Sequence, residues 1–522
     1  MDHKKSAKNS VVVMLCTLLS RILGILRSRT IATVFGATHI ADTINFSFNI
    51  PNNFRKLFAE GALSSAYIPR FSALIAKDND NVTLSGELLA RMQAFQVVIT
   101  LPLIIITWFF KVPIIKFLSD FSDSQQIELS ANLLFYFMFF LATITFATLY
   151  SGLLQSHLSF FVAAASPLLF SIAVIASITF LSDTLGPFSM VVGVIGGGLL
   201  QTLVNFFALK RLGYTFHFSF NFKNEEFKQV MAAYLPVTLT AIIAIIGQQI
   251  AFYFASGLSE GVITAFSNAI IIWQAPYGIF YTAIATVFFP AMAYSYNKGD
   301  YNQFGSVVFK GLTHIATFLL PATIMLLFFK NETTAVLLQS GKFTLNDTLE
   351  TANILFYFAI GMIFVAYYSF WQRICFSTNK FKIALKVALV LLILDVSLTL
   401  LFLKLGLKAT SLSLANTIAN FVALILIWVL TYEKTKFVYK LHQFYKSIAL
   451  LIGANTPLII FALIYKINSK SLWWQSGSNK KNFLILCAIY LIGALIILIS
   501  YFLFKIDFMS LFRKEKEARR PL

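Results

Sequence analysis

The chain has 522 residues, of which 58% are hydrophobic and only 12% carry a charge. A soluble protein would carry about 25% charged residues, and the mean hydropathy here is +0.78. Apolar runs of the roughly 20 residues that a helix needs to cross a bilayer recur from one end to the other. The composition therefore excludes a soluble globular protein. It predicts an all-α polytopic membrane protein with about fourteen transmembrane helices.

The net charge of +19 does not indicate a nucleic-acid partner, because most Lys and Arg residues lie in loops between the apolar runs. Loops rich in Lys and Arg face the cytoplasm in multi-pass membrane proteins. An even number of spans with both termini cytoplasmic places most of these loops on one side, namely 70–77, 210–211, 380–382, 434–446 and 513–520. The loops with Lys404, Lys408 and residues 466–481 depart from this pattern. We therefore predict cytoplasmic termini.

The first apolar run contains "LSRILGILRSRT", which places Arg21 and Arg27 inside a helix of membrane length. An arginine at the bilayer centre costs about 2.5–3.5 kcal/mol on insertion scales, so such residues usually face a protein interior or a wet cavity. Gly24 lies between the two arginines, where it loosens the helix, and we take it as a candidate hinge. The two guanidinium groups are therefore expected to line a polar space.

The second run, "ADTINFSFNIPNNFRKLFAEG", carries polar residues at steps of three and four, which keeps them on one helical face. This polar stripe consists of Asp42, Asn45, Asn49, Asn52 and Lys56. The asparagines alone are explained by amide hydrogen bonds between helices.

The charges of these two runs do not balance. Four cations (Arg21, Arg27, Arg55 and Lys56) have only Asp42 and Glu60 as nearby acids. Arginine matches phosphate oxygens in a bidentate fashion. The excess of positive charge therefore predicts a cationic cavity that receives a diphosphate or a similarly anionic headgroup.

An internal repeat divides the chain. "ANLLFYF" at 131–137 recurs as "ANILFYF" at 352–358, and Gln201 in "LLQTLVNFFAL" matches Asn416 in "SLANTIANFVAL". Pro51 has a weaker counterpart in Pro276. A parallel repeat of this kind is one of the architectures of alternating-access transporters, which bind substrate between the halves. We predict an N-terminal lobe (1–215, helices 1–6), a C-terminal lobe (216–435, helices 7–12) and a segment with two further helices and a basic cytoplasmic tail (436–522).

The sequence contains no sign of catalysis or of a cofactor. Cys16, Cys375 and Cys487 lie in separate apolar segments, and the six histidines form no metal-binding motif. We therefore expect a non-enzymatic protein without a metal or cofactor. Asp395, in a late apolar run, is a candidate ion-coupling residue or an acid that pairs two helices.

The stretches "LSRILGILRSRTIATVFGA" and "ADTINFSFNIPNNFRKLFAEGALSSAYIPRF" resemble the N-terminal signature of the MurJ (MviN) family of bacterial lipid II flippases. This family belongs to the multidrug/oligosaccharidyl-lipid/polysaccharide exporter superfamily. "SGKFTLNDTLET" and the Pro276-Tyr-Gly…Pro290 pattern agree with it. The resemblance implies fourteen helices in two pseudo-symmetric lobes around a cationic cavity, with the last two helices forming a groove for the lipid tail. It implies export of the undecaprenyl-pyrophosphate-linked peptidoglycan precursor across the bacterial inner membrane.

Carried onto this chain, the resemblance and the polar stripe together nominate the site residues. Substrate binding is expected from Arg21, Arg27, Arg55, Asp42, Asn49, Asn52 and Lys56. Hinges are expected at Gly24, Pro51, Pro276 and Gly278, and ion coupling at Asp395 and Glu60. Ile271 departs from the family, which often has an arginine at this position.

The expected partners are lipid II, the surrounding membrane lipids, and a coupling cation or the membrane potential. Two alternatives remain within the superfamily: a flippase of another lipid-linked oligosaccharide, and a drug/cation antiporter. An antiporter for cationic drugs would present buried acids, whereas the first two runs of this chain are basic.

Overall fold

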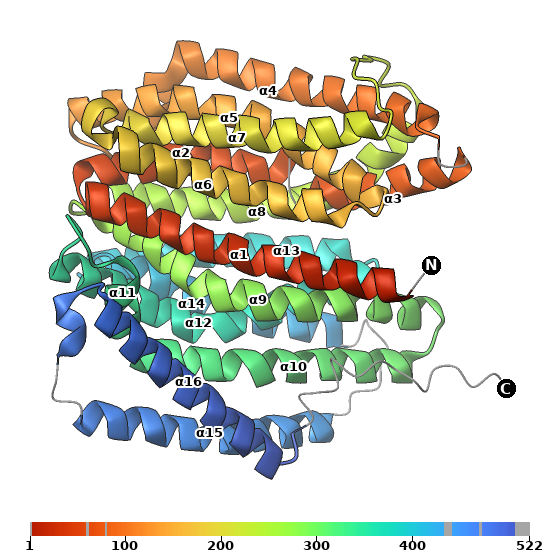
Figure 1. The fold of residues 1–522 in the computed structure, drawn as a ribbon. Coiled ribbons are helices and arrows are strands. Elements are labelled where there is room, and N and C mark those ends of the chain that lie inside the picture. Colours follow the sequence, from red (N-terminus) through yellow and green to blue (C-terminus); the bar gives the residue numbers. More distant parts are fainter. Residues whose placement is uncertain (1–2, 59–61, 79–80, 433–440, 469–471, 507–522) are drawn as a thin grey trace. The chain divides into compact units, whose positions relative to one another are not determined.

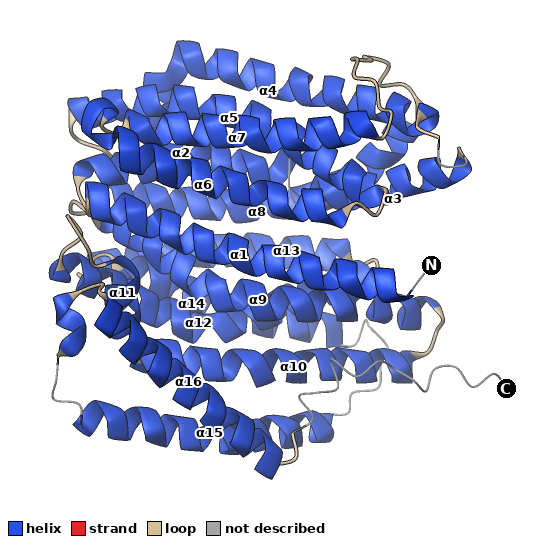
Figure 2. Cartoon of the chain, viewed as in Figure 1, coloured by secondary structure: helices blue, strands red, loops and turns tan. Residues whose placement is uncertain are grey.

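The computed structural model describes residues 3–58, 62–78, 81–432, 441–468 and 472–506. Within these ranges every regular element is a helix (Figure 2). Twelve of the helices in the described part are long and apolar enough to cross a membrane, so the chain is a multi-pass membrane protein. The predicted all-α fold class is confirmed, and the number of fourteen spans stays a prediction.

The chain forms two compact units, one made of residues 1–267 and 338–347 and the other of 268–337 and 348–522. The first unit contains α1 (His3–Phe35), α2 (His39–Phe58), α3 (Ala62–Lys77), α4 (Thr83–Leu118), α5 (Ser124–Ser156), α6 (Phe160–Leu185), α7 (Phe188–Arg211) and α8 (Glu225–Ser256). Helix α9 (Val262–Asn297) begins in the first unit and continues into the second. The second contains α10 (Tyr301–Phe328), most of α11 (Lys330–Leu338) and of α12 (Leu345–Ser377), α13 (Phe381–Lys404), α14 (Thr410–Tyr432), α15 (Leu441–Asn468), the 3-10 helix η1 (Trp473–Ser476) and α16 (Lys480–Leu503).

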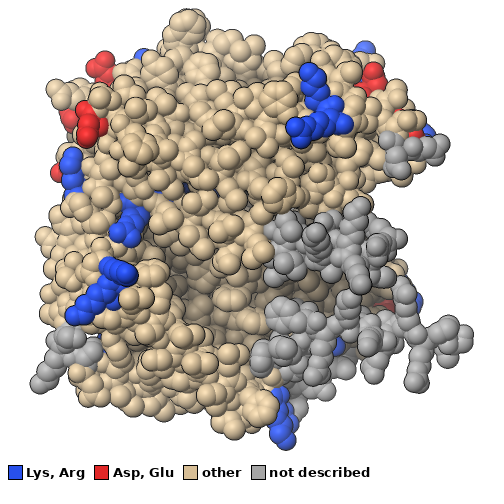
Figure 3. Space-filling view, viewed as in Figure 1, with Lys and Arg blue, Asp and Glu red and all other residues tan. Residues whose placement is uncertain are grey.

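In the first unit, α5 packs against α2, α4 and α7, and α6 packs against α7 and α1 (Figure 1). Buried apolar side chains join these helices, among them Phe35 of α1, Ile44 of α2 and Phe137 of α5. Large apolar side chains are also exposed, such as Phe117 at 81% and Phe180 at 80%. Most of the face drawn in Figure 3 belongs to residues other than Lys, Arg, Asp and Glu. Such a surface matches hydrocarbon rather than water.

The helix boundaries repeat along the chain. Aligning the first residue of α12 with the first residue of α5 also aligns their last residues. The same shift brings α1 onto α8, α6 onto α13 and α7 onto α14 to within two residues at each end, and α9 corresponds to α2 and α3 together. The "ANLLFYF" match follows this register. The match of Gln201 to Asn416 does not, because the ends of α7 and α14 place Gln201 opposite Val422 or Ala423. The limits of the two predicted lobes, at 215 and 435, stay a prediction.

Helices α15 and α16, which have no counterpart in the repeat, attach to the second unit through α10. A buried ion pair adds to this attachment. Glu332 of α11 is only 2% exposed, and its carboxylate accepts a hydrogen bond from the Lys466 ammonium of α15. The same ammonium lies 5.5 Å from the centre of the Phe329 ring. The pair therefore joins α15 to the short helix α11.

Removing one partner of this pair would leave an unpaired buried charge, which costs about 3–5 kcal/mol. We expect Lys466→Met to lower the thermal unfolding temperature of the purified protein clearly. The double variant Lys466→Met/Glu332→Gln should recover most of the loss, because it removes both charges. Equal unfolding temperatures for the wild type and Lys466→Met would contradict this account.

Candidate functional site

The polar stripe of α2 packs against α8 and the first turn of α9. Asn45 donates to the Thr264 hydroxyl at 3.2 Å, and Asn49 donates to Gln249 at 3.4 Å. Gln248 donates to the Asn49 carbonyl at 3.2 Å. Asn45 and Asn49 of the predicted polar face thus join helices, as expected for amide side chains in a membrane protein.

Lys56 ends this stripe and bonds to two amide oxygens. Its ammonium donates to Gln248 at 2.8 Å and to Asn53 at 3.1 Å. Arg55, one residue earlier, donates from Nε to the Asn52 carbonyl at 3.0 Å. Both cations therefore contact side-chain amide oxygens of α2, and Lys56 also contacts α8.

Asp42 holds the start of α9. Its carboxylate accepts the backbone N–H of Gly261 at 2.7 Å, and the N–H and hydroxyl of Thr264 at 2.8 and 2.6 Å. Asp42 is 4% exposed. Donors at a helix N-terminus have no partner within the helix, and the helix dipole favours a negative charge there. Asp42 therefore caps α9 from α2, and its three acceptor contacts are made with α9 and not with a guanidinium.

The arginines lie on α1 and α2. The exposed apolar residues of α1 form one face, made of Leu15, Leu18, Leu19, Ile22 and Leu26. Arg27 lies off that face, with its guanidinium 5.4 Å from the centre of the Phe170 ring of α6. Among the described residues no carboxylate forms an ion pair with Arg27, and Arg21 is half-buried on the same helix.

The turn between α1 and α2 contacts the segment 338–347, which belongs to the same compact unit. The Thr33 carbonyl accepts the N–H of Lys342 at 3.0 Å, and the hydroxyls of Thr33 and Ser340 are 2.5 Å apart. Gly341 has a φ of +57°, and a Cβ there would lie 2.3 Å from the Thr33 carbonyl oxygen. A side chain at this position is therefore excluded.

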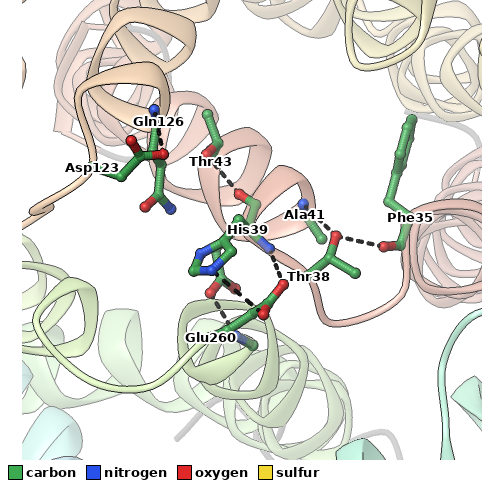
Figure 4. A network of polar contacts seen from close by, with 10 residues as sticks. Phe35, Thr38, His39, Ala41, Thr43, Asp123, Gln126 and Glu260 are labelled. Atoms are coloured by element: carbon green, nitrogen blue, oxygen red, sulfur yellow. Dashed lines mark hydrogen bonds and ion pairs between the residues drawn. The ribbon is translucent and has the colours of Figure 1, made fainter.

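The first turn of α2 is fixed from both sides. The Thr38 hydroxyl donates to the Phe35 carbonyl at 2.9 Å and accepts the N–H of Ala41 at 3.5 Å. The His39 N–H donates to Glu260 at 2.8 Å, and Figure 4 shows the two side chains directed toward each other. Together with Asp42, these contacts join the α1–α2 turn to the turn before α9.

Comparison with known proteins shows the family of the chain. The family model described as lipid II flippase MurJ matches residues 31–487. The chain belongs to the lipid II flippase MurJ family. The probable lipid II flippase MurJ of Borreliella burgdorferi is 28% identical over 498 residues, which cover 95% of this chain and 96% of that protein. The lipid II flippase MurJ of Burkholderia cenocepacia is 27% identical over 393 residues, covering 72% and 74%.

Solved structures share the fold. A structure of lipid II flippase MurJ in an inward closed conformation has a TM-score of 0.74 at 21% identity, covering 96% of this chain and 100% of that one. An inward-facing multidrug resistance transporter of the MATE family has a TM-score of 0.63 at 14% identity, covering 80% and 94%. The helical architecture is thus that of MurJ, and it is shared with MATE transporters.

The remaining predicted site residues are the hinge and ion-coupling candidates. Gly24, Pro276 and Gly278 lie inside α1 and α9, as Pro51 lies inside α2, and their role as hinges stays a prediction. Asp395 of α13 accepts a hydrogen bond from Asn416 of α14 at 3.0 Å, which pairs these two helices. Glu60 lies outside the described residues.

The sequence did not predict two residues of this candidate site, Gln248 and Gln249 of α8. They stand alone in an apolar run and form no motif of their own. The repeat was the signal that could have found them. When α8 is aligned with α1 in the register of the helix boundaries, the two glutamines occupy the position of Arg27.

The Asp42 cap is testable by its effect on folding. We expect Asp42→Ala to destabilise the protein by about 1–3 kcal/mol, because the N–H groups of Gly261 and Thr264 lose their acceptor. Asp42→Asn should cost less, since one carbonyl oxygen remains. Thermal unfolding in detergent measures both, with the exposed Asp183→Ala as the matched control. The cap would be refuted if Asp42→Ala and Asp183→Ala unfolded at the same temperature.

Proposed function

We propose that this chain moves lipid II from the cytoplasmic to the outer leaflet of the bacterial inner membrane, without catalysing a reaction. One observation carries the proposal. Arg27 lies off the exposed apolar face of α1, against the Phe170 ring, and no carboxylate among the described residues forms an ion pair with it. A pyrophosphate would supply the missing negative charge, and guanidinium groups bind phosphate oxygens bidentately.

The proposed binding site comprises Arg21, Arg27, Arg55 and Lys56, with Asn49 and Asn52 on the same face of α2. Asp42 contributes by holding α9 in place beside it. A pyrophosphate that contacts both Arg27 and Arg55 binds more tightly to a conformation that brings the two guanidinium groups together. A ligand shifts a conformational equilibrium only through such a difference in affinity. This provides the driving force for closure around the headgroup.

The proposed cycle is alternating access between two lobes, 1–215 and 216–435, with both termini in the cytoplasm. In this orientation the α1–α2 turn and the segment 338–347 lie at the outer face. Gly24, Pro51, Pro276 and Gly278 are the proposed hinges. Asp395, Glu60 or the membrane potential would couple the cycle to an energy source.

The central test removes one guanidinium at a time. We expect Arg27→Ala and Arg55→Ala each to reduce lipid II export by about tenfold or more, since a hydrogen bond to a charged group contributes about 1.5–3 kcal/mol. Export is measured in cells depleted of the native protein, as the fraction of lipid II accessible from outside. Immunoblotting verifies equal amounts of each variant.

Arg29→Ala is the matched control. Arg29 lies two residues from Arg27 on α1, in line with Ile22 and Leu26 on the exposed apolar face. The same change at this position should leave export close to the wild-type level. Normal export by both Arg27→Ala and Arg55→Ala would contradict the proposal.

The proposed cycle also requires the outer end to open. In a variant lacking the three native cysteines, Thr33→Cys/Ser340→Cys places two thiols where the hydroxyls are 2.5 Å apart. Oxidation should join them and abolish export, and a reducing agent should restore it. The two single-cysteine variants are the controls. Full export by the cross-linked protein would show that this contact persists throughout the cycle.

A further inference from the structure

The Lys56 ammonium sets the direction of every hydrogen bond in the amide network between α2 and α8. An ammonium group has three donors and no acceptor. Lys56 donates to Oε1 of Gln248 at 2.8 Å and to Oδ1 of Asn53 at 3.1 Å. Both amides must therefore direct their oxygen toward Lys56 and their NH₂ group away from it. The usual ambiguity between the oxygen and nitrogen of an amide is removed at these two residues.

The same direction passes along the network. Because its oxygen faces Lys56, Gln248 donates from Nε2 to Oδ1 of Asn49 at 3.2 Å. Asn49 is then left with its NH₂ group, which donates to Oε1 of Gln249 at 3.4 Å. The network therefore ends in an NH₂ group at Gln249 and, on its other branch, in an NH₂ group at Asn53.

These two terminal nitrogen atoms, Nε2 of Gln249 and Nδ2 of Asn53, are buried and have no hydrogen-bond partner in the described part of the chain. Asn53 as a whole is 3% exposed. Buried N–H groups without an acceptor are rare in native proteins, since each loses its bond to water without a replacement. A network that ends only in donors, beside an ammonium, fits a ligand rich in acceptor oxygens.

The repeat independently places the glutamines at a functional position. When the last residues of α1 and α8 are aligned, Arg27 falls on Gln248. When their first residues are aligned instead, Arg27 falls on Gln249. The first half of the chain thus has a guanidinium where the second half has two amides, and both groups are donors of several hydrogen bonds.

We propose that Gln249 and Asn53 bind acceptor oxygens of the lipid-linked headgroup, beside Lys56, and that Gln248 and Asn49 orient Gln249 for this contact. This inference rests on the proposed function and extends it to residues of α8. The acceptors are pyrophosphate or sugar oxygens, which share the same hydrogen-bonding chemistry. In this conformation both nitrogen atoms are enclosed, so the ligand reaches them by displacing the side chains around them.

The test measures binding to the purified full-length protein in detergent, with lipid II and undecaprenyl pyrophosphate as the two probes. We expect Gln249→Leu and Asn53→Leu each to weaken lipid II binding by about tenfold, the equivalent of one hydrogen bond. Gln249→Glu keeps the volume of the side chain and replaces its donor by a charged acceptor, so it should weaken binding at least as much. This variant also serves if Gln249→Leu fails to fold.

The matched control is Gln96→Leu, which makes the same change at a buried glutamine of α4 that bonds to the Thr145 carbonyl. It should bind lipid II like the wild type.

The two probes distinguish the acceptors. If the Gln249 and Asn53 variants lose affinity for lipid II but not for undecaprenyl pyrophosphate, the acceptors are sugar oxygens. If they lose affinity equally for both probes, the acceptors are pyrophosphate oxygens. Folded Gln249→Glu and Asn53→Leu proteins with wild-type affinity for lipid II would overturn the inference. Wild-type protein that binds neither probe would instead refute the proposed function.

Discussion

The charge of Arg27 has no partner of opposite sign among the described residues, and this constraint shapes the surrounding structure. Its guanidinium lies over the Phe170 ring of α6. A cation inside a membrane-length helix persists when it faces protein or a wet cavity. Arg27 meets that condition because it lies off the exposed apolar face of α1. In the proposed mechanism this charge binds the anionic ligand.

The surrounding polar groups join α2 to its neighbours. The carboxylate of Asp42 accepts three hydrogen bonds from Gly261 and Thr264 at the start of α9. Lys56 donates to the amide oxygens of Gln248 and Asn53, which orient its ammonium group. These contacts join α2 to α8 and α9. In the proposed mechanism the same polar stripe also binds the anionic ligand.

The spacing of the polar residues was enough to predict which side chains share a face of α2. What this face contacts could not be predicted, because Gln249 lies far along the chain from Asn49 and its run carries no motif. Asp42 illustrates the limit further, since an acid near two arginines is expected to pair with them, and only the position of α9 reveals its role as a cap. The repeat was predicted from short matches. Its register became clear only from the ends of the helices. The "ANLLFYF" match agrees with that register, and the match of Gln201 to Asn416 does not.

The account is tested most directly by a structure of this protein with lipid II bound. We predict that the pyrophosphate lies within hydrogen-bonding distance of the guanidinium groups of both Arg27 and Arg55. A bound pyrophosphate that contacts neither group, with both arginines instead paired to carboxylates, would contradict the account.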